Sequence, residues 1–175
     1  MYLAIVLDLF NREVIGWSLK PRMTTDIVTD ALTMAWFCRR PAAGVMHHSD
    51  RGNQDEFTQY ASHAFQNTLR AFGMTCSMSC KRNCWDHAPT ESWFASFKNE
   101  RYDGVRYPAR AEMKAASFEY IEVFYNRIRQ HSTLGYQSPI QYLHRWSSEQ
   151  NQEKLVAKKS PDGRRNIEGK AIAGS

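Results

Sequence analysis

Residues 2–20 read YLAIVLDLFNREVIGWSLK, and this stretch decides the fold. Residues 3–7 form a continuous apolar run rich in β-branched side chains, which is typical of a strand covered on both faces. Residues 8–12 indicate a turn, and residues 14–19 indicate a returning strand. We therefore expect a β-hairpin over residues 2–20 that ends at Pro21.

Helices and strands alternate after the hairpin. Hydrophobic spacing and capping residues predict a helix, a strand, a helix, a strand and two helices, over residues 24–38, 45–48, 55–72, 74–79, 89–100 and 109–130. The first of these helices is expected to turn one face toward the core, with Ile27, Ala31, Met34 and Cys38. The order ββαβαβαα predicts an α/β domain in which helices flank a single sheet.

The composition is that of a folded domain. Hydrophobic residues make up 42% of the 175 residues and aromatic residues 13%, which is enough to build a core and excludes a wholly disordered chain. After Trp146 the chain is rich in Ser, Glu, Gln, Lys and Gly and has almost no large apolar residue. We therefore expect a core over residues 1–146 and a disordered tail over residues 147–175.

Neither a membrane span nor an export signal is predicted. The longest apolar stretch, residues 3–7, is too short to cross a bilayer and lacks the basic flank and cleavage site of a signal peptide. We therefore expect a cytoplasmic protein. Lys and Arg number 23 against 18 Asp and Glu, giving a net charge of +5, which favours a polyanionic partner but is common among soluble proteins.

Two acidic residues stand where a metal site is built in α/β proteins. Asp50 follows the end of a buried strand, at the sheet edge where ligands bind, and Glu91 lies in the first turn of the helix opened by Pro89. Hard Mg²⁺ or Mn²⁺ prefers such oxygen ligands. Two of these ions about 3.5–4 Å apart would activate a nucleophile and stabilise a leaving oxygen in phosphoryl transfer.

The same residues also have a purely structural interpretation. Asp50 would cap a turn, and Glu91 would favour the positive end of its helix. Lys98, which lies seven residues after Glu91 on the same helix face, would be a solvated surface lysine. Spacing alone leaves the chemical and the structural interpretations open.

Six groups of motifs in a fixed order indicate a family. They are residues 2–12 (YLAIVLDLFNR) with 14–17 (VIGW), 48–54 (HSDRGNQ), 77–79 (SMS), 83–86 (NCWD), 91–94 (ESWF) with 97–100 (FKNE), and 124–127 (FYNR) leading to 131–139 (HSTLGYQSP). On these motifs the chain resembles the integrase-core transposases of bacterial insertion sequences. These are the OrfB type within the DDE group, which also includes retroviral integrases. The resemblance runs from Tyr2 to about Trp146.

The resemblance implies both a fold and a reaction. The fold is a ribonuclease-H-like mixed sheet flanked by helices. The reaction is attack by water, and then by a DNA 3′-hydroxyl, on a phosphodiester, with Mg²⁺ or Mn²⁺ as cofactor. Asp50 matches the second metal-binding Asp of the family, and Glu91 matches its metal-binding Glu. Lys98 matches the basic residue that meets the DNA ends, and Arg51 is predicted as a second DNA contact. The implied partners are insertion-sequence ends, target DNA and further copies of the chain.

The chain departs from the family pattern in three ways. The family has a further catalytic Asp on a strand before the hairpin, and the sequence begins inside the next strand; Asp8 matches a turn position instead. That missing strand is the central one of the family's sheet, between the hairpin and the strand that carries His48. Its absence would leave unpaired backbone groups that cost about 1–3 kcal/mol each, so poor folding or rearranged strand pairing is expected. The spacing from Asp50 to Glu91 also indicates an insertion at residues 55–59.

Three functions are therefore compared. The first is a DDE recombinase domain that cuts and joins DNA. The second is a catalytically inactive, truncated transposase remnant that binds DNA nonspecifically through basic residues. The third is a ribonuclease-H-like nuclease without strand transfer, which residues 124–139 disfavour because that segment belongs to the transposase pattern.

Overall fold

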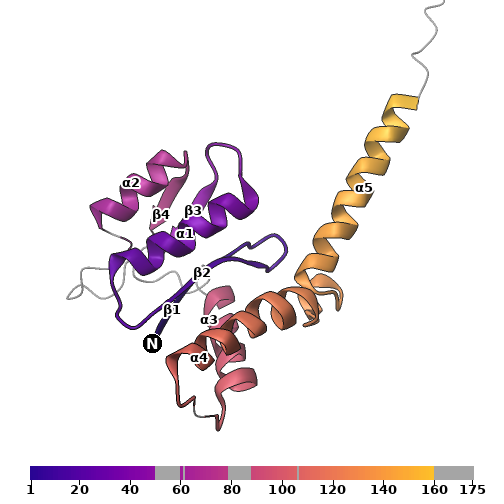
Figure 1. Cartoon of the computed structure of the whole chain (residues 1–175). Coiled ribbons are helices and arrows are strands. Elements are labelled where there is room, and N and C mark those ends of the chain that lie inside the picture. The colour runs from indigo at the N-terminus through magenta and orange to yellow at the C-terminus, as the bar shows by residue number, and fades with distance from the viewer. Residues whose placement is uncertain (50–59, 61, 79–87, 106, 160–175) are drawn as a thin grey trace, which may run out of the picture. The chain divides into compact units, whose positions relative to one another are not determined.

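The computed structural model describes residues 1–49, 60, 62–78, 88–105 and 107–159 (Figure 1). Strands β1 (Tyr2–Leu7) and β2 (Val14–Lys20) form the predicted antiparallel hairpin, in which Ile5 lies opposite Trp17. The amide of Asp8 donates to the carbonyl of Glu13 at 2.8 Å and closes the turn.

The apolar run of β1 is covered on both faces, as its sequence predicts. Ala4 and Val6 pack into one hydrophobic core, whereas Leu3, Ile5 and Leu7 pack into a second core. This division follows from the alternation of side chains along a strand. The hairpin is therefore the shared wall of two cores.

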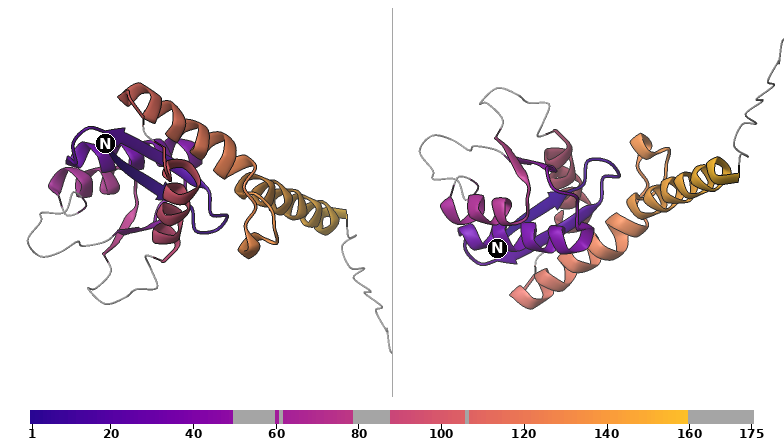
Figure 2. Two further views of the ribbon diagram at one scale, coloured as in Figure 1. Left: turned by 90° about the horizontal axis from the view of Figure 1, so that it is seen from below. Right: turned by 90° about the horizontal axis from the view of Figure 1, so that it is seen from above.

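Helix α1 (Thr25–Arg39) covers the first face of the hairpin (Figures 1 and 2). Its buried residues are Ile27, Val28, Ala31, Leu32 and Ala35. The sequence correctly predicts Ile27 and Ala31 as inward residues, but Met34 and Cys38 are exposed. The helix is rotated from the predicted orientation because Ala31 and Ala35 lie against Gly16 of β2.

A βαβ unit follows α1. Strands β3 (Met46–Ser49) and β4 (Thr75–Met78) are parallel, and α2 (His63–Ala71) connects them. The hydroxyl of Ser62 accepts from the amide of Phe65 at 3.2 Å and caps α2. Phe65 and Leu69 of α2 complete the core that α1 begins.

The described strands form two separate two-stranded sheets, β1–β2 and β3–β4, and no pairing joins them within the described residues. A groove of about 670 Å³ is lined by residues of β1, α1 and β3. Three buried polar atoms of its lining lack a hydrogen-bond partner among the described residues: Trp36 Nε1, His47 Nε2 and Ser49 Oγ. This is the position at which the family resemblance places a further strand.

The second core is aromatic and holds the other helices on the hairpin. Helix α3 (Ala88–Phe97) continues into the π-helical turn η2 (Lys98–Tyr102), and α4 (Arg110–Phe118) continues into the π-helical turn η3 (Glu119–Tyr125). Trp93, Phe97, Tyr120 and Tyr125 pack together with Val14 of β2. The predicted helices over residues 89–100 and 109–130 thus exist, each with a π-helical turn.

Asn126 fixes the end of this helix to the hairpin. Its side chain is buried, donates to the carbonyl of Val14 and accepts from the Val14 amide, both at 3.0 Å. One side chain therefore satisfies two backbone groups of β2, as a neighbouring strand would.

A last helix, α5 (Pro139–Lys159), follows the 3-10 turn η4 (Ser132–Leu134). The compact unit that contains the hairpin covers Met1–Tyr142, and a second unit starts at Leu143. Residues 147–159 are helical where the sequence predicts a disordered tail. Polar residues of high helix propensity account for this difference, with an Arg145–Glu149 pair at 3.6 Å along the helix. In the described part of the chain, no helix has the length and apolarity of a membrane span.

Candidate active site

Glu91 lies in the first turn of α3, and its side chain is exposed. Trp93 and Phe97 anchor the opposite face of this helix, because they are buried and their rings stack with centroids 4.9 Å apart. Among the described residues, no cation or hydrogen-bond donor pairs with the Glu91 carboxylate. Within the described part of the chain, the Glu91 carboxylate is therefore exposed and unpaired on a helix that Trp93 and Phe97 hold in place.

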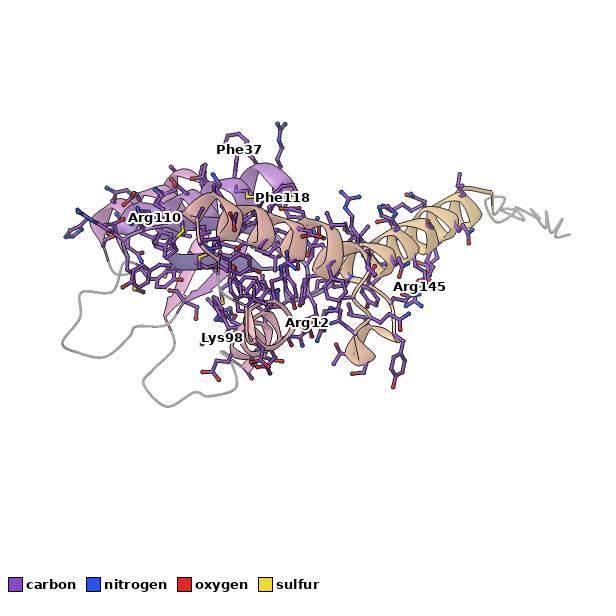
Figure 3. The ribbon with its side chains drawn as sticks, turned by 60° about the horizontal axis from the view of Figure 1, so that its bottom comes forward. Arg12, Phe37, Lys98, Arg110, Phe118 and Arg145 are labelled. Carbon is purple, nitrogen blue, oxygen red and sulfur yellow. The ribbon has the colours of Figure 1, made fainter. Side chains whose placement is uncertain are left out.

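Lys98 is the first residue of η2, the π-helical turn that continues α3, and it is also exposed (Figure 3). Seven residues of helix correspond to a rise of about 10 Å and to two turns, so both side chains share one face. No carboxylate of the described residues forms a salt bridge with Lys98. The pairing of an acid and a base on one helix face stays a prediction from helical spacing.

The predicted site residues Asp50 and Arg51 lie outside the described residues, as does the predicted insertion at residues 55–59. The residue before Asp50 is described: Ser49 ends β3, and its side chain is buried. Ser49 and Thr90, the residue before Glu91, line the same groove of about 670 Å³. The residues that precede the two predicted metal ligands in the chain therefore border one groove.

His47 of β3 lines the groove, and its environment disfavours the charged form of its side chain. Burial lowers the pKa of His47 to about 4, and the neighbouring His48 lowers it further. The folded-state pKa lies below the usual value of 6.5, so His47 is neutral at pH 7 and takes up a proton only in acid. Among the described residues, the fixed cation of the lining is Arg39 of α1, and it is paired with the carboxylates of Asp8 and Glu13.

The sequence motifs contain a further acid, Glu100, whose carboxylate is hydrogen-bonded to Arg129 and Tyr120. Arg129 donates to both of its carboxylate oxygens, at 2.7 and 3.0 Å, and the Tyr120 hydroxyl donates at 2.7 Å. Partial burial raises the pKa of Glu100, but these hydrogen bonds outweigh it and lower the pKa overall. Glu100 therefore joins η2 to η3 and is not a free metal ligand.

Sequence reasoning did not find this network. Glu100 and Arg129 stand 29 residues apart, and no spacing rule connects them. The only signal was that Glu100 closes the FKNE motif and that Arg129 follows the FYNR motif.

The sequence of the chain is similar to those of known proteins. Residues 1–84 match a family model described as an integrase core domain, and residues 91–145 match a second model of the same description. The chain is 44% identical over 142 residues to the transposase InsF for insertion sequence IS3A of Escherichia coli K12, covering 81% of this chain and 48% of that protein. The chain belongs to the integrase-core transposases of bacterial insertion sequences. The family that the motifs indicate is thus confirmed.

This transposase chain has a second curated relative in the 31 kDa protein of insertion element IS600 of Shigella sonnei. The two are 39% identical over 146 residues, which cover 83% of this chain and 52% of the relative. The chain spans about half the length of the curated relatives it matches.

Solved structures confirm the fold class of the transposase chain. A chain of the simian T-cell lymphotropic virus intasome, in complex with PP2A regulatory subunit B56 gamma, matches with a TM-score of 0.60 and 18% identity. That match covers 99% of this chain and 53% of the viral chain. The catalytic core domain of BIV integrase matches with a TM-score of 0.54 and 17% identity, over 84% of this chain and 88% of that domain. The ribonuclease-H-like fold is therefore shared.

Proposed function

We propose that this chain is part of the catalytic core of a transposase that cuts DNA at insertion-sequence ends and joins those ends to target DNA. The observation that supports this proposal is that the end of β3 and the first turn of α3 line the same groove. Ser49 and Thr90, the neighbours of Asp50 and Glu91, both line it. Glu91 itself is exposed and has no cation partner among the described residues.

Asp50 and Glu91 are the proposed metal ligands. Their carboxylate oxygens suit Mg²⁺ or Mn²⁺, and the bound metal would supply activation of the attacking oxygen and stabilisation of the leaving oxygen. The contribution of the chain is positional, because Trp93 and Phe97 fix α3 and thereby fix the backbone of Glu91. A carboxylate on a rigid helix loses little freedom when it binds an ion.

Lys98 and Arg51 are the proposed DNA contacts. Lys98 is exposed and has no ion-pair partner among the described residues, so it can neutralise a phosphate, and the net charge of +5 favours the approach of a polyanion. A homo-oligomer on DNA is proposed as well, since both transposon ends must be held together during joining.

We expect Lys98→Ala to weaken binding of duplex DNA by about three- to tenfold and to lower the salt dependence by about one counterion. Fluorescence anisotropy with a labelled duplex at several salt concentrations measures both quantities. Lys114→Ala is the matched control, because Lys114 is also an exposed helical lysine, on α4. Equal effects of the two substitutions would show that Lys98 contributes only to the general charge.

A catalytically inactive, truncated remnant that binds DNA nonspecifically is the second candidate. It is favoured by the groove between the two separate sheets of the described residues, where Trp36 Nε1, His47 Nε2 and Ser49 Oγ are buried without a partner among those residues. Both candidates share the groove, the fold and the basic residues, and they differ in whether the metal site is complete.

We therefore expect no measurable strand transfer when residues 1–175 alone are given Mn²⁺ and duplexes that carry insertion-sequence ends. Gel analysis of labelled end oligonucleotides and a supercoiled target plasmid measures joining. Robust joining that disappears in Asp50→Asn would instead show that these residues hold a complete catalytic site.

A further inference from the structure

A second cavity of the hairpin unit has no role in the proposed metal chemistry. Its volume is about 590 Å³, which is in the range of small-ligand sites. The turn of the hairpin, helix α3 and residues 130–136 each contribute to its lining. Figure 3 shows Arg12, from the hairpin turn, between α3 and the loop that follows η3.

Arg12 is an arginine of the cavity lining that has no salt bridge within the described part of the chain. Among the described residues, no carboxylate forms a salt bridge with Arg12, whereas Arg129, the other arginine of the lining, is paired with Glu100. The charge of Arg12 also contributes to the lowered pKa of His131, after the larger effects of burial and of Arg129. The positive charge of Arg12 therefore influences the protonation of His131, which lines the same cavity.

The backbone holds Arg12 in place at a conformational cost. Its φ angle is 61°, in the left-handed region that non-glycine residues rarely adopt. The neighbours on both sides are buried: Asn11 donates to the carbonyl of Pro139 at 3.2 Å, and Glu13 pairs with Arg39. The turn cannot relax without breaking these buried contacts.

Tyr136 also lines the cavity and also has a positive φ angle. Its φ angle is 58°, and its amide donates to the carbonyl of His131 at 2.9 Å. The side chain is 71% exposed. Among the described residues, three that are not glycine have a positive φ, and two of them, Arg12 and Tyr136, line this one cavity. Backbone strain of this kind concentrates at ligand sites.

We propose that this cavity binds one unpaired nucleotide of a DNA strand, with its phosphate on Arg12 and its base against the ring of Tyr136. A guanidinium matches the paired oxygens of a phosphate, and an exposed tyrosine ring is a stacking platform for any base. The hydroxyl of Ser92, which also lines the cavity, is a further donor for the phosphate. The proposal rests on the proposed DNA substrate and adds a site at which the DNA strands separate.

The test compares two DNA probes of equal length. One is a blunt duplex, and the other carries a single-stranded thymidine overhang with one 2-aminopurine at its junction. We expect Arg12→Ala to weaken binding of the overhang probe by about tenfold and binding of the blunt duplex by about twofold. Arg40→Ala is the matched control, because Arg40 is exposed, has a φ of 44° and lies outside the lining. It should affect both probes by about twofold.

Stacking is read from the quenching of 2-aminopurine. We expect Tyr136→Ala to remove the quenching and Tyr136→Phe to keep it, since phenylalanine retains the ring. Arg12→Lys, which keeps the charge but loses the planar fork, should weaken overhang binding by about threefold, and it serves if Arg12→Ala does not fold. Thermal unfolding followed by circular dichroism identifies the folded variants.

Each outcome decides between the two proposals. Binding of both probes with equal affinity, or equal losses in Arg12→Ala and Arg40→Ala, would overturn the nucleotide site while leaving DNA as the substrate. Quenching that survives Tyr136→Ala would overturn the stacking role. Failure of the wild-type chain to bind either probe would overturn the proposed function itself, and the nucleotide site with it.

Discussion

Gly16→Ala will destabilise the hairpin unit by more than about 3 kcal/mol, the upper end of the usual cost of overpacking a core. A Cβ atom at this position would lie 2.1 Å from the carbonyl oxygen of Ala31, 2.7 Å from the amide nitrogen of Ala35 and 2.8 Å from the Ala35 Cβ. Two of these three contacts are with backbone atoms, which cannot rotate away. The methyl group would therefore push α1 off the hairpin and open the first core.

Urea denaturation of the purified Gly16→Ala variant measures the loss of unfolding free energy. A variant too unstable to purify would be missing from the soluble fraction of the cell lysate. Gly104→Ala is the control, because a Cβ there meets nothing within 4 Å and the position has a φ of 70°. The control should cost about 1–2 kcal/mol through its left-handed backbone alone. If Gly16→Ala were no more destabilising than Gly104→Ala, then α1 would not pack on β2 at this distance.

The same contact explains what the sequence could and could not predict about α1. Helical spacing correctly predicts Ile27 and Ala31 as inward residues. The same spacing selects Met34 and Cys38 as well, because they continue the face that Ile27 and Ala31 begin. The structure instead places Ala35 inward, because α1 approaches Gly16 of β2 so closely that a small side chain is needed at this contact. Such a preference depends on a partner 15 or more residues away and is not visible in the helix alone.

The hairpin was predictable for the opposite reason, because all of its determinants are local. Alternation along β1 sends Ala4 and Val6 to one core and Leu3, Ile5 and Leu7 to the other. The connection through Asn126 was not predictable, because an asparagine that satisfies both backbone groups of Val14 has no local signature. The Glu100–Arg129 pair escaped prediction for the same reason.

For the candidate site, residue types and their positions along the chain could be predicted, and their convergence could not. The sequence correctly predicts that Glu91 lies in the first turn of a helix, whereas a shared face for Glu91 and Lys98 stays a prediction. That Ser49 and Thr90 border one groove depends on where the fold places β3 and α3, which lie far apart in the chain. Asp50 and Arg51 lie outside the described residues, so their roles remain predictions.

Glu91→Gln will reduce strand transfer by about 10³-fold or more in a complemented enzyme, which is the scale of loss when a group that stabilises transition-state charge is removed. The complemented enzyme is a fusion of residues 1–175 to the part of the Escherichia coli IS3A relative that lies outside the match, which is about half of that protein. Its substrates are duplexes with IS3 ends. Glutamine keeps the shape of the side chain but removes the charge that a hard divalent cation requires. Joined products are quantified on gels with Mg²⁺ and with Mn²⁺.

Glu112→Gln is the matched control, because Glu112 is likewise exposed in the first turn of a helix, α4. Both substitutions remove one negative charge from a helix N-terminus and so cost similar small amounts of helix stability. A ligand role predicts that only Glu91→Gln loses activity. Comparable losses in the two variants would instead support the structural interpretation of Glu91.

DNA binding separates a metal ligand from a residue that merely repels or orients DNA. A carboxylate that holds a cation contributes to joining in the presence of metal, so binding of duplex DNA in EDTA should change by about twofold or less in Glu91→Gln. Lys98→Ala should show the reverse pattern, with weaker binding in EDTA and a smaller loss of joining at saturating DNA. If Glu91→Gln altered metal-free binding as much as Lys98→Ala does, its carboxylate would be acting on the phosphates directly, and the proposed division of roles along α3 and η2 would be wrong.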